Sequence, residues 1–401
     1  AYRLGQNTVI RGGAGIYYTL PNTDEINNFT TTAPFSPLIS LTGVSFQNPY
    51  GSVGVTNPFP GSYASAALPP SNVSFVLPVG VGGTFGPRYK LPTVATWNLS
   101  VQRQVGANWL FSLGYFANAG YDLSSNAVGR EQVDPAIYIP GQSTVANTQS
   151  RRINPNFSGV QFYPTDYVSR YEALQVNAEK RFSHGISLLA NYTFSKKEDD
   201  YGPNGTVTDP FDRALDWGIS KDNVPNLFRL SAVWNTPRLT SNRAAGGLLN
   251  GWEVTGITTW QSGFPFTVFS GMDNSRSGIG ADRAEFTGSN IGQTVLSGQS
   301  TAQEITRYFN TSLFTTNPIG NFGNSPKNTL EGPRMFNQDF AAIKNFPIAE
   351  RMHLQFRGEF FNLFNNVNFS KPGSTVNSGG FGKITAAGSP RILQFALKLV
   401  F

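Results

Sequence analysis

The chain has 401 residues, no cysteine, 13% charged residues and a formal net charge of +6. The lack of cysteine excludes a disulfide scaffold and a cysteine zinc site, and lysine and arginine are too evenly spread to indicate a nucleic-acid-binding surface. No segment approaches the ~20 consecutive apolar residues of a membrane helix, so only strands are left as a way to cross a membrane.

Apolar and polar residues alternate in ten segments, each about long enough to cross a membrane once. Trp97, Leu99 and Val101, for example, alternate with Asn98 and Ser100. A period of two is typical of a strand with one apolar and one polar face. A partial strand before Gly5 is also expected. We predict full strands at about 8–18, 93–105, 108–118, 170–182, 186–196, 226–236, 251–261, 336–346, 350–364 and 391–401.

The predicted connections between these strands alternate in length. They are long at 19–92, 119–169, 197–225, 262–335 and 365–390, short at 106–107, 183–185 and 347–349, and of medium length at 237–250. Short and long connections therefore lie at opposite ends of the strands. Outer-membrane barrels have tight periplasmic turns and long extracellular loops. The sequence therefore predicts an all-β fold, an antiparallel transmembrane β-barrel segment of about 10–11 strands.

Several large aromatic residues lie near predicted strand ends, where amphipathic rings suit a bilayer interface. They would also suit the core of a soluble protein. The residues are Tyr17, Tyr18, Trp109, Tyr192, Trp234, Trp252 and Trp260.

Charged side chains on the late strands indicate which face is wet. In the segment 350–364, apolar residues alternate with a polar row. An arginine that faces lipid at mid-bilayer costs ~2–4 kcal/mol, so the polar row is expected to face a lumen. The lumen-facing candidates are Arg229, Gln355, Arg357 and Glu359. Cross-strand pairing within the wall is the favoured role for them, ahead of contacts with a plug or a substrate.

Several motifs resemble the TonB-dependent receptors, in particular the Oar-like, acidobacterial type. They are VIRGGAGIYY at 9–18, GWEVTG at 251–256, QSGFPFT at 261–267, FRGEFFNLFN at 356–365 and PRILQFALKLVF at 390–401. The last segment resembles the family's final strand, in which Phe395, Leu397, Leu399 and Phe401 would form the signal read by the barrel-assembly machinery.

The resemblance implies that residues 1–401 are the C-terminal part of a 22-stranded barrel. It also implies that the signal peptide, an N-terminal β-sandwich and a plug that contacts the TonB complex lie outside this chain. The expected place is the outer membrane of a Gram-negative bacterium, with lipid and lipopolysaccharide as neighbours. The expected activity is uptake of a nutrient such as a siderophore, a peptide or an oligosaccharide.

Two other classes remain as alternatives. Ten to twelve strands also suffice for a complete small barrel, which would be a passive porin or a surface adhesin. A soluble β-sandwich or propeller is less consistent with the sequence, because no repeat of fixed length is present.

Enzymatic chemistry has little support. The two histidines, His184 and His353, lie far apart in the sequence, and no G-x-S-x-G motif is present. We predict neither catalytic residues nor cofactors. The segment 273–278 opens like a calcium loop, with Asp273, Ser275 and Ser277 as weak metal candidates. Position twelve of such a loop, which supplies a bidentate glutamate in calcium sites, is Ala284 here. A Gly/Asx turn is therefore the favoured interpretation.

One predicted loop is rich in carboxylates. It could bind a divalent ion that bridges loops or lipopolysaccharide, but a simply solvated loop is the favoured interpretation. The residues are Glu198, Asp199, Asp200, Asp209, Asp212, Asp216 and Asp222.

Overall fold

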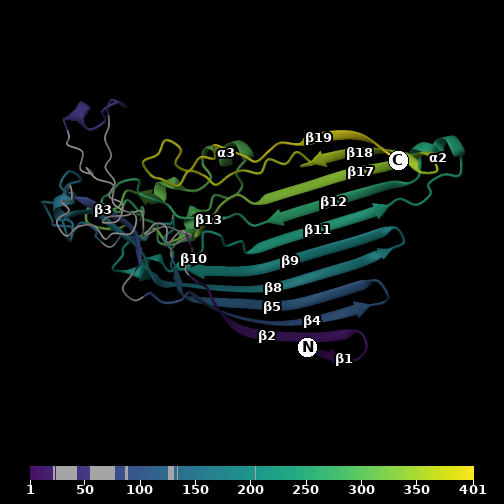
Figure 1. Ribbon diagram of the computed structural model, residues 1–401, viewed down its shortest axis with the longest axis horizontal. Helices are drawn as coiled ribbons and strands as arrows, with labels where there is room; N and C mark the ends of the chain where they lie inside the picture. Colours follow the sequence, from purple (N-terminus) through teal and green to yellow (C-terminus); the bar gives the residue numbers. More distant parts are fainter. Residues whose placement is uncertain are drawn as a thin grey trace.

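The computed structural model describes residues 1–20, 23, 43–54, 77–85, 89–124, 131–132, 134–203 and 205–401. It has two regions, a large curved sheet and a folded set of loops at one end of that sheet (Figure 1). No helix within these residues is long and apolar enough to cross a membrane. Much of the predicted loop at 19–92 lies outside the described residues.

The sheet is antiparallel, and eleven of its strands follow one another in chain order; we call these eleven strands the wall. They are β1 (Tyr2–Leu4), β2 (Thr8–Tyr18), β4 (Thr93–Val105), β5 (Trp109–Ser124), β8 (Thr165–Ser183), β9 (Ile186–Asp199), β11 (Asn226–Asn235), β12 (Trp252–Gln261), β17 (Met335–Ala349), β18 (Met352–Phe361) and β19 (Ile392–Val400). All ten predicted strands and the partial strand before Gly5 are confirmed. A further two-residue strand, β10 (Gly218–Ile219), pairs with β9.

The pairing register divides the wall into two faces. Residues that lie directly opposite each other on paired strands share a face. Four such residues on successive strands, Trp97, Ala117, Glu172 and Lys196, therefore lie on the same face of the wall. One face carries most of the large apolar side chains, and we call it the apolar face. The other, the polar face, carries most of the uncharged polar residues. The separation is not complete, since Leu189 and Ile257 lie on the polar face.

The short and long connections lie at opposite ends of the wall, as predicted (Figure 1). At the short turn after β8, His184 and Gly185 both have positive φ, at 51° and 77°. A Cβ added at Gly185 would meet the Asn235 carbonyl oxygen at 2.5 Å, so only glycine fits there. The turn predicted at 347–349 lies at residues 350–351 instead, because β17 continues to Ala349 through a register shift. The medium connection contains the helix α2 (Arg243–Leu249), which the sequence analysis missed.

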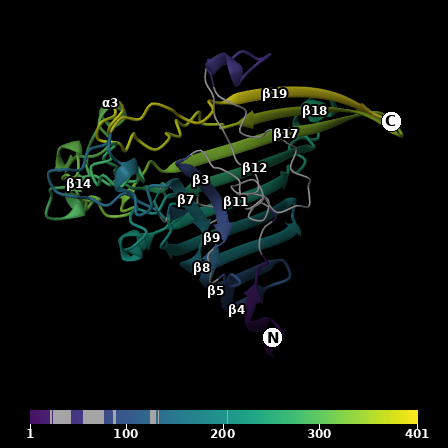
Figure 2. The ribbon, with the colours of Figure 1, turned by 60° about the vertical axis from the view of Figure 1, so that its left-hand side comes forward.

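The long connections fold together as a second region. We call the described residues of the connections 131–164, 200–225, 262–334 and 362–391 the cap. It contains the short strands β6 (Glu131–Gln132), β7 (Phe157–Tyr163), β13 (Pro265–Phe266), β14 (Glu285–Phe286), β15 (Phe314–Thr315) and β16 (Leu330–Glu331), the helix α3 (Thr301–Thr306) and the 3-10 turns Gln149–Arg151, Arg213–Asp216, Ile291–Thr294 and Thr311–Leu313. β3 (Val79–Phe85) pairs in parallel with β7, and a 3-10 turn covers Gly51–Val53. Figure 2 shows β14 and α3 at the end of the wall opposite the short turns.

The cap has its own hydrophobic core. Its buried members are Phe266, Val268, Ala284, Phe309, Phe314 and Leu330. The ring of Phe309 contacts those of Phe266, Phe314 and Phe381 at centroid distances of 5.5–5.8 Å. Residues far apart in the sequence thus form one compact unit, held by the same apolar burial as a small soluble domain.

Candidate functional site

The predicted lumen residues share the polar face of the wall. The register of β17, β18 and their neighbours places Arg357 and Glu359 on this face, and Arg229 lies opposite Asn191 and Thr259 on it. Arg357 Nε lies 2.9 Å from Glu359 Oε1, and Gln355 Nε2 donates to Asn345 Oδ1 over 3.0 Å. The first contact lies within β18 and only the second crosses between strands, so the cross-strand pairing predicted for Arg357 and Glu359 stays a prediction. That the face borders a lumen stays a prediction.

The apolar face ends in two groups of aromatic rings. Of the predicted interface residues, Trp109, Trp234 and Trp252 lie at the short-turn end of this face, and Tyr18, Tyr192 and Trp260 lie toward the loop end. Tyr17 points to the polar face instead, because it neighbours Tyr18 on the same strand.

The residues Phe395, Leu397 and Leu399 of β19 also lie on the apolar face, and Phe401 follows the strand. Their predicted role in assembly stays a prediction.

Two lysines interrupt the apolar face near the short turns, and both are tied to the backbone. Lys180 Nζ donates to the carbonyl oxygens of Ser183 and Ile186, each over 2.8 Å. Lys344 Nζ donates to the Asn250 carbonyl oxygen and lies 5.5 Å from the Trp252 ring centroid. Each ammonium group therefore reaches past its apolar neighbours to polar atoms at the strand ends, as lysine does at a membrane interface.

At the loop end, a buried lysine joins the cap to the wall. Lys327 Nζ donates to the side chain of Asp199 over 2.5 Å and to the main-chain oxygens of Asp199 and Asp216, each over 2.8 Å. The Lys327 side chain is 2% exposed. All three ammonium hydrogens have acceptors, which offsets the cost of burying the charge. Burial nevertheless lowers the pKa of Lys327, against the opposing effect of Asp199.

A second polar cluster holds the loop 200–225 in shape. Both oxygens of the Asp216 carboxylate accept from Thr208, one from the backbone nitrogen over 2.8 Å and one from the hydroxyl over 2.6 Å. Arg283 reaches into the same region from the loop 262–334 and donates to the Leu215 carbonyl oxygen over 2.8 Å. Burial lowers the pKa of Arg283. The loops 200–225 and 262–334 are thus joined through Arg283.

The neighbouring carboxyl of Asp200 lies in a similar environment. Its Oδ1 accepts from the Val168 backbone nitrogen over 2.9 Å, and its Oδ2 lies 3.5 Å from Arg213. Burial raises the pKa of Asp200, and the hydrogen bond and Arg213 oppose that rise. Burial likewise raises the pKa of Tyr201, whose ring stacks on Tyr167 at 4.4 Å between centroids.

The expectation of a solvated acidic loop is therefore wrong for Asp199, Asp200 and Asp216, all of which are buried. The sequence pattern showed a run of carboxylates but not their partners. Lys327 lies more than one hundred residues away and Arg283 almost seventy, so no local spacing could identify them.

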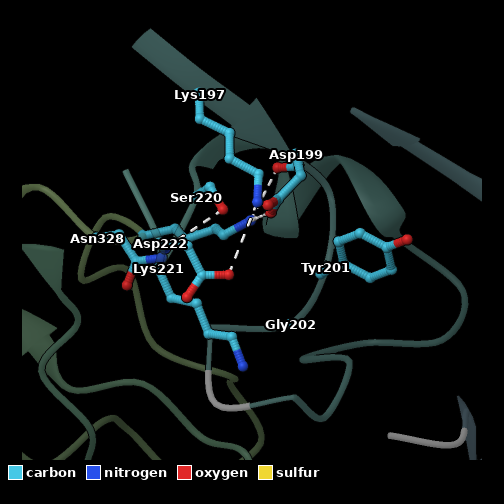
Figure 3. Close-up of a pocket in the computed structure, with 9 residues that line it drawn as sticks. Lys197, Asp199, Tyr201, Gly202, Ser220, Lys221, Asp222 and Asn328 are labelled. Carbon is cyan, nitrogen blue, oxygen red and sulfur yellow. Dashed lines mark hydrogen bonds and ion pairs between the residues drawn. The ribbon is translucent and has the colours of Figure 1, made fainter. Parts of the chain in front are cut away.

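Beside this network lies a cavity of about 160 Å³, at the loop end of β9 (Figure 3). Lys197 and Asp199 enter it from the polar face of the strand, and Lys197 Nζ lies 3.7 Å from Asp222 Oδ2. The lining residues are Lys197, Asp199, Tyr201, Gly202, Ser220, Lys221, Asp222, Lys327 and Asn328. The sequence analysis missed this site, apart from its two carboxylates.

The weak metal candidates form a closed hydrogen-bonded turn. The Ser275 hydroxyl donates to Asp282 Oδ1 over 2.6 Å and lies 2.9 Å from the Ser277 hydroxyl oxygen. Asp273 accepts from the Gly278 backbone nitrogen, which closes the turn across five residues. Burial raises the pKa of Asp282. Within the described residues, no group of three or more His, Cys, Asp or Glu side chains is arranged to hold a metal ion.

A family model described as an outer membrane beta barrel domain matches residues 1–394. No curated protein matches the chain significantly. Among solved structures, FpvA of Pseudomonas aeruginosa bound to pyoverdines is similar over all of this chain and 31% of its own, with 12% identity and a TM-score of 0.43.

The outer membrane transporter YddB from Escherichia coli is similar over 80% of this chain and 34% of its own, with 9% identity and a TM-score of 0.44. BauA, the ferric preacinetobactin receptor from Acinetobacter baumannii, is similar over 81% of this chain and 32% of its own, with 13% identity and a TM-score of 0.39. The chain thus spans about a third of the length of each of these three proteins.

Proposed function

The chain belongs to the outer membrane beta-barrel domain family, and from that premise we propose that it forms about half of the wall of a plugged uptake receptor of the TonB-dependent type. In this proposal the polar face borders the lumen and the apolar face borders lipid. The cap lies outside the cell, above the entrance to the barrel, and the short turns lie in the periplasm.

The observation that carries the proposal is the open sheet. Within the described residues, β1 and β19 are the two ends of the path of strands and do not pair with each other. An unpaired backbone amide or carbonyl in hydrocarbon costs several kcal/mol, so open edges do not occur in a membrane. In the proposed receptor, further strands pair with both edges. Eleven strands are half of the 22 found in plugged outer-membrane transporters, whereas smaller barrels close on themselves.

The two faces support an uptake role over a structural one. The polar face presents Arg229, Arg357 and Glu359 to the interior, where they can contact a plug or guide a polar solute. The cap supplies a rigid surface in which a cavity opens beside the same face. We infer that the substrate is a nutrient of the siderophore, peptide or oligosaccharide class. Energy coupling through TonB would reside in N-terminal parts outside this chain.

The native protein, extracted unheated from outer membranes, provides the test. We expect an intact mass well above 43.6 kDa, with additional peptides that encode a plug. In a planar lipid bilayer the purified protein should carry no steady ionic current, because a plug fills the barrel. A mass of 43.6 kDa together with a steady open-pore current would identify a passive porin and refute the proposal.

A further inference from the structure

The opening of the cavity at the loop end of β9 carries a net positive charge. Of its five charged side chains, Lys327 and Asp199 are buried and bonded to each other, so they contribute no net charge to the cavity. Lys197, Lys221 and Asp222 remain at its opening. Lys197 forms an ion pair with Asp222 at 3.7 Å, and Lys221 is exposed. The accessible groups therefore carry two positive charges and one negative charge, which favours an anionic ligand.

The size of the cavity limits that ligand. A cavity needs about 10–15 Å³ to hold one water molecule, so 160 Å³ corresponds to about ten waters or a solute with roughly ten non-hydrogen atoms. This is the size of a single sugar or sugar acid. A whole metal chelate or a folded peptide is too large to enter, although one end of it could.

The remaining walls suit a hydroxylated molecule. Ser220, which is 1% exposed, and Asn328 offer polar atoms at fixed positions. Asn328 is held by its own bonds, since its Nδ2 donates to the Ile219 carbonyl oxygen and its Oδ1 accepts from Thr267. The Tyr201 ring is fixed by its stacking on Tyr167. Figure 3 shows Tyr201 on the opposite side of the cavity from Ser220. An aromatic wall with a few fixed polar groups is typical of a small-molecule site.

We propose that this cavity binds a small hydroxylated carboxylate, the size of one uronate sugar, with Lys197 and Lys221 holding the carboxylate. The inference rests on the proposed function in one respect, because it makes acidic oligosaccharides the substrate class of the receptor. The site lies on the polar face at the loop end of the wall, beside the cap.

Glucuronate and glucose form a matched pair of probes, since they differ only by the carboxylate. Titrated into the detergent-solubilised native protein by calorimetry, glucuronate should bind and glucose should not. Loss of one charged hydrogen-bond partner weakens binding roughly tenfold or more, so Lys197→Gln and Lys221→Gln should each show that loss. Lys196→Gln is the control, because Lys196 is the adjacent lysine of β9 and lies on the opposite, apolar face.

The outcomes separate cleanly. Equal binding of glucose, or unchanged affinity in both cavity variants, would overturn the inference. If acetate displaced glucuronate with equal affinity, the cavity would be a simple anion site and the hydroxylated part of the proposal would fail. Binding does not need energised uptake. If the protein bound glucuronate but conducted ions like an open pore, the site would stand and only the proposed receptor would be refuted. If the protein were plugged but did not bind glucuronate, the proposed receptor would stand and only this inference would be refuted.

Discussion

The wall and the cap bury their side chains in opposite ways. In the wall, Leu397 is 69% exposed and Phe395 is 62% exposed within the chain, whereas in the cap Val268 and Ala284 are fully buried. The cap also buries charged groups, among them Lys327 against Asp199 of β9 and Arg283 against the loop 200–225. In the proposed receptor, lipid covers the apolar face of the wall, whereas the cap buries an apolar core as a soluble domain does.

The buried ion pair between Lys327 and Asp199, which joins the cap to the wall, should be the contact whose loss destabilises the cap most. Lys327→Met keeps the side-chain length but leaves the buried carboxylate of Asp199 without its partner, and breaking a buried pair costs about 3–5 kcal/mol. Hydrogen exchange should show that loss in cap peptides, while the strands of the wall keep their protection.

Lys196→Met is the matched control for this change. Its partner Glu198 lies on the outer surface, and exposed ion pairs contribute about 0–1 kcal/mol. If both variants increased hydrogen exchange in the cap to the same degree, the buried Lys327–Asp199 pair would not be what holds the cap to the wall.

Removal of a large side chain from the core of the cap should lower the stability of the cap, as it does in a soluble protein. Phe309→Ala removes a ring that contacts three others and should cost roughly 3–5 kcal/mol, or less if the neighbouring rings close the gap. Limited proteolysis should then cut the loop 262–334 first. Phe395→Ala, on the apolar face of the wall, should leave that loop resistant. Early cleavage of the loop in Phe395→Ala would show that the two regions do not fold separately.

The wall should be sensitive to charge on one face only. Leu113→Arg places a guanidinium on the apolar face of β5 and should cost ~2–4 kcal/mol near mid-bilayer. Ser112→Arg, on the adjacent residue, points to the polar face and should be tolerated. The folded fraction in lipid vesicles, read as heat-modifiable migration on a gel, measures both. Equal loss for the two variants would contradict the assigned faces.

The smallest expected effect is a pH dependence in the cap. Because burial raises the pKa of Asp200, the folded cap binds that proton more tightly than the unfolded chain does. Its contribution to stability therefore increases as pH falls and is lost as pH rises through the folded pKa. The charged groups that interact with it include Arg213, Asp166 and Lys327.

The stability of the wild-type cap, compared with that of Asp200→Asn, should rise as pH is lowered from 7 toward 4. Acid effects on other groups are common to both proteins and cancel in the difference. A difference that falls over the same range would show that the carboxylate is stabilised in the cap, against the assigned cause.

The two regions also differ in what the sequence could predict. The period of two predicted all the wall strands, because apolar and polar side chains alternate along each of them. Each strand also pairs with the next wall strand in the sequence, so the order of the strands followed directly. Tyr17 shows the limit of that reasoning, since nearness to a strand end does not say which face a residue takes. In the cap, the decisive contacts join Lys327 to Asp199 and Arg283 to Leu215 across long stretches of chain. Such contacts leave no periodic trace, so neither the core of the cap nor the cavity could be predicted.

The assignment of the two faces of the wall can be tested most directly on β5. The chain has no cysteine, so single cysteines can be introduced at positions 110–116 and labelled with a nitroxide in the native protein in lipid vesicles. We predict that labels at Phe111, Leu113 and Tyr115 are accessible to oxygen dissolved in the bilayer, and that labels at Leu110, Ser112, Gly114 and Phe116 are accessible to a water-soluble nickel complex. Loss of this alternation, or its reversal, would contradict the account of a wall between lipid and lumen.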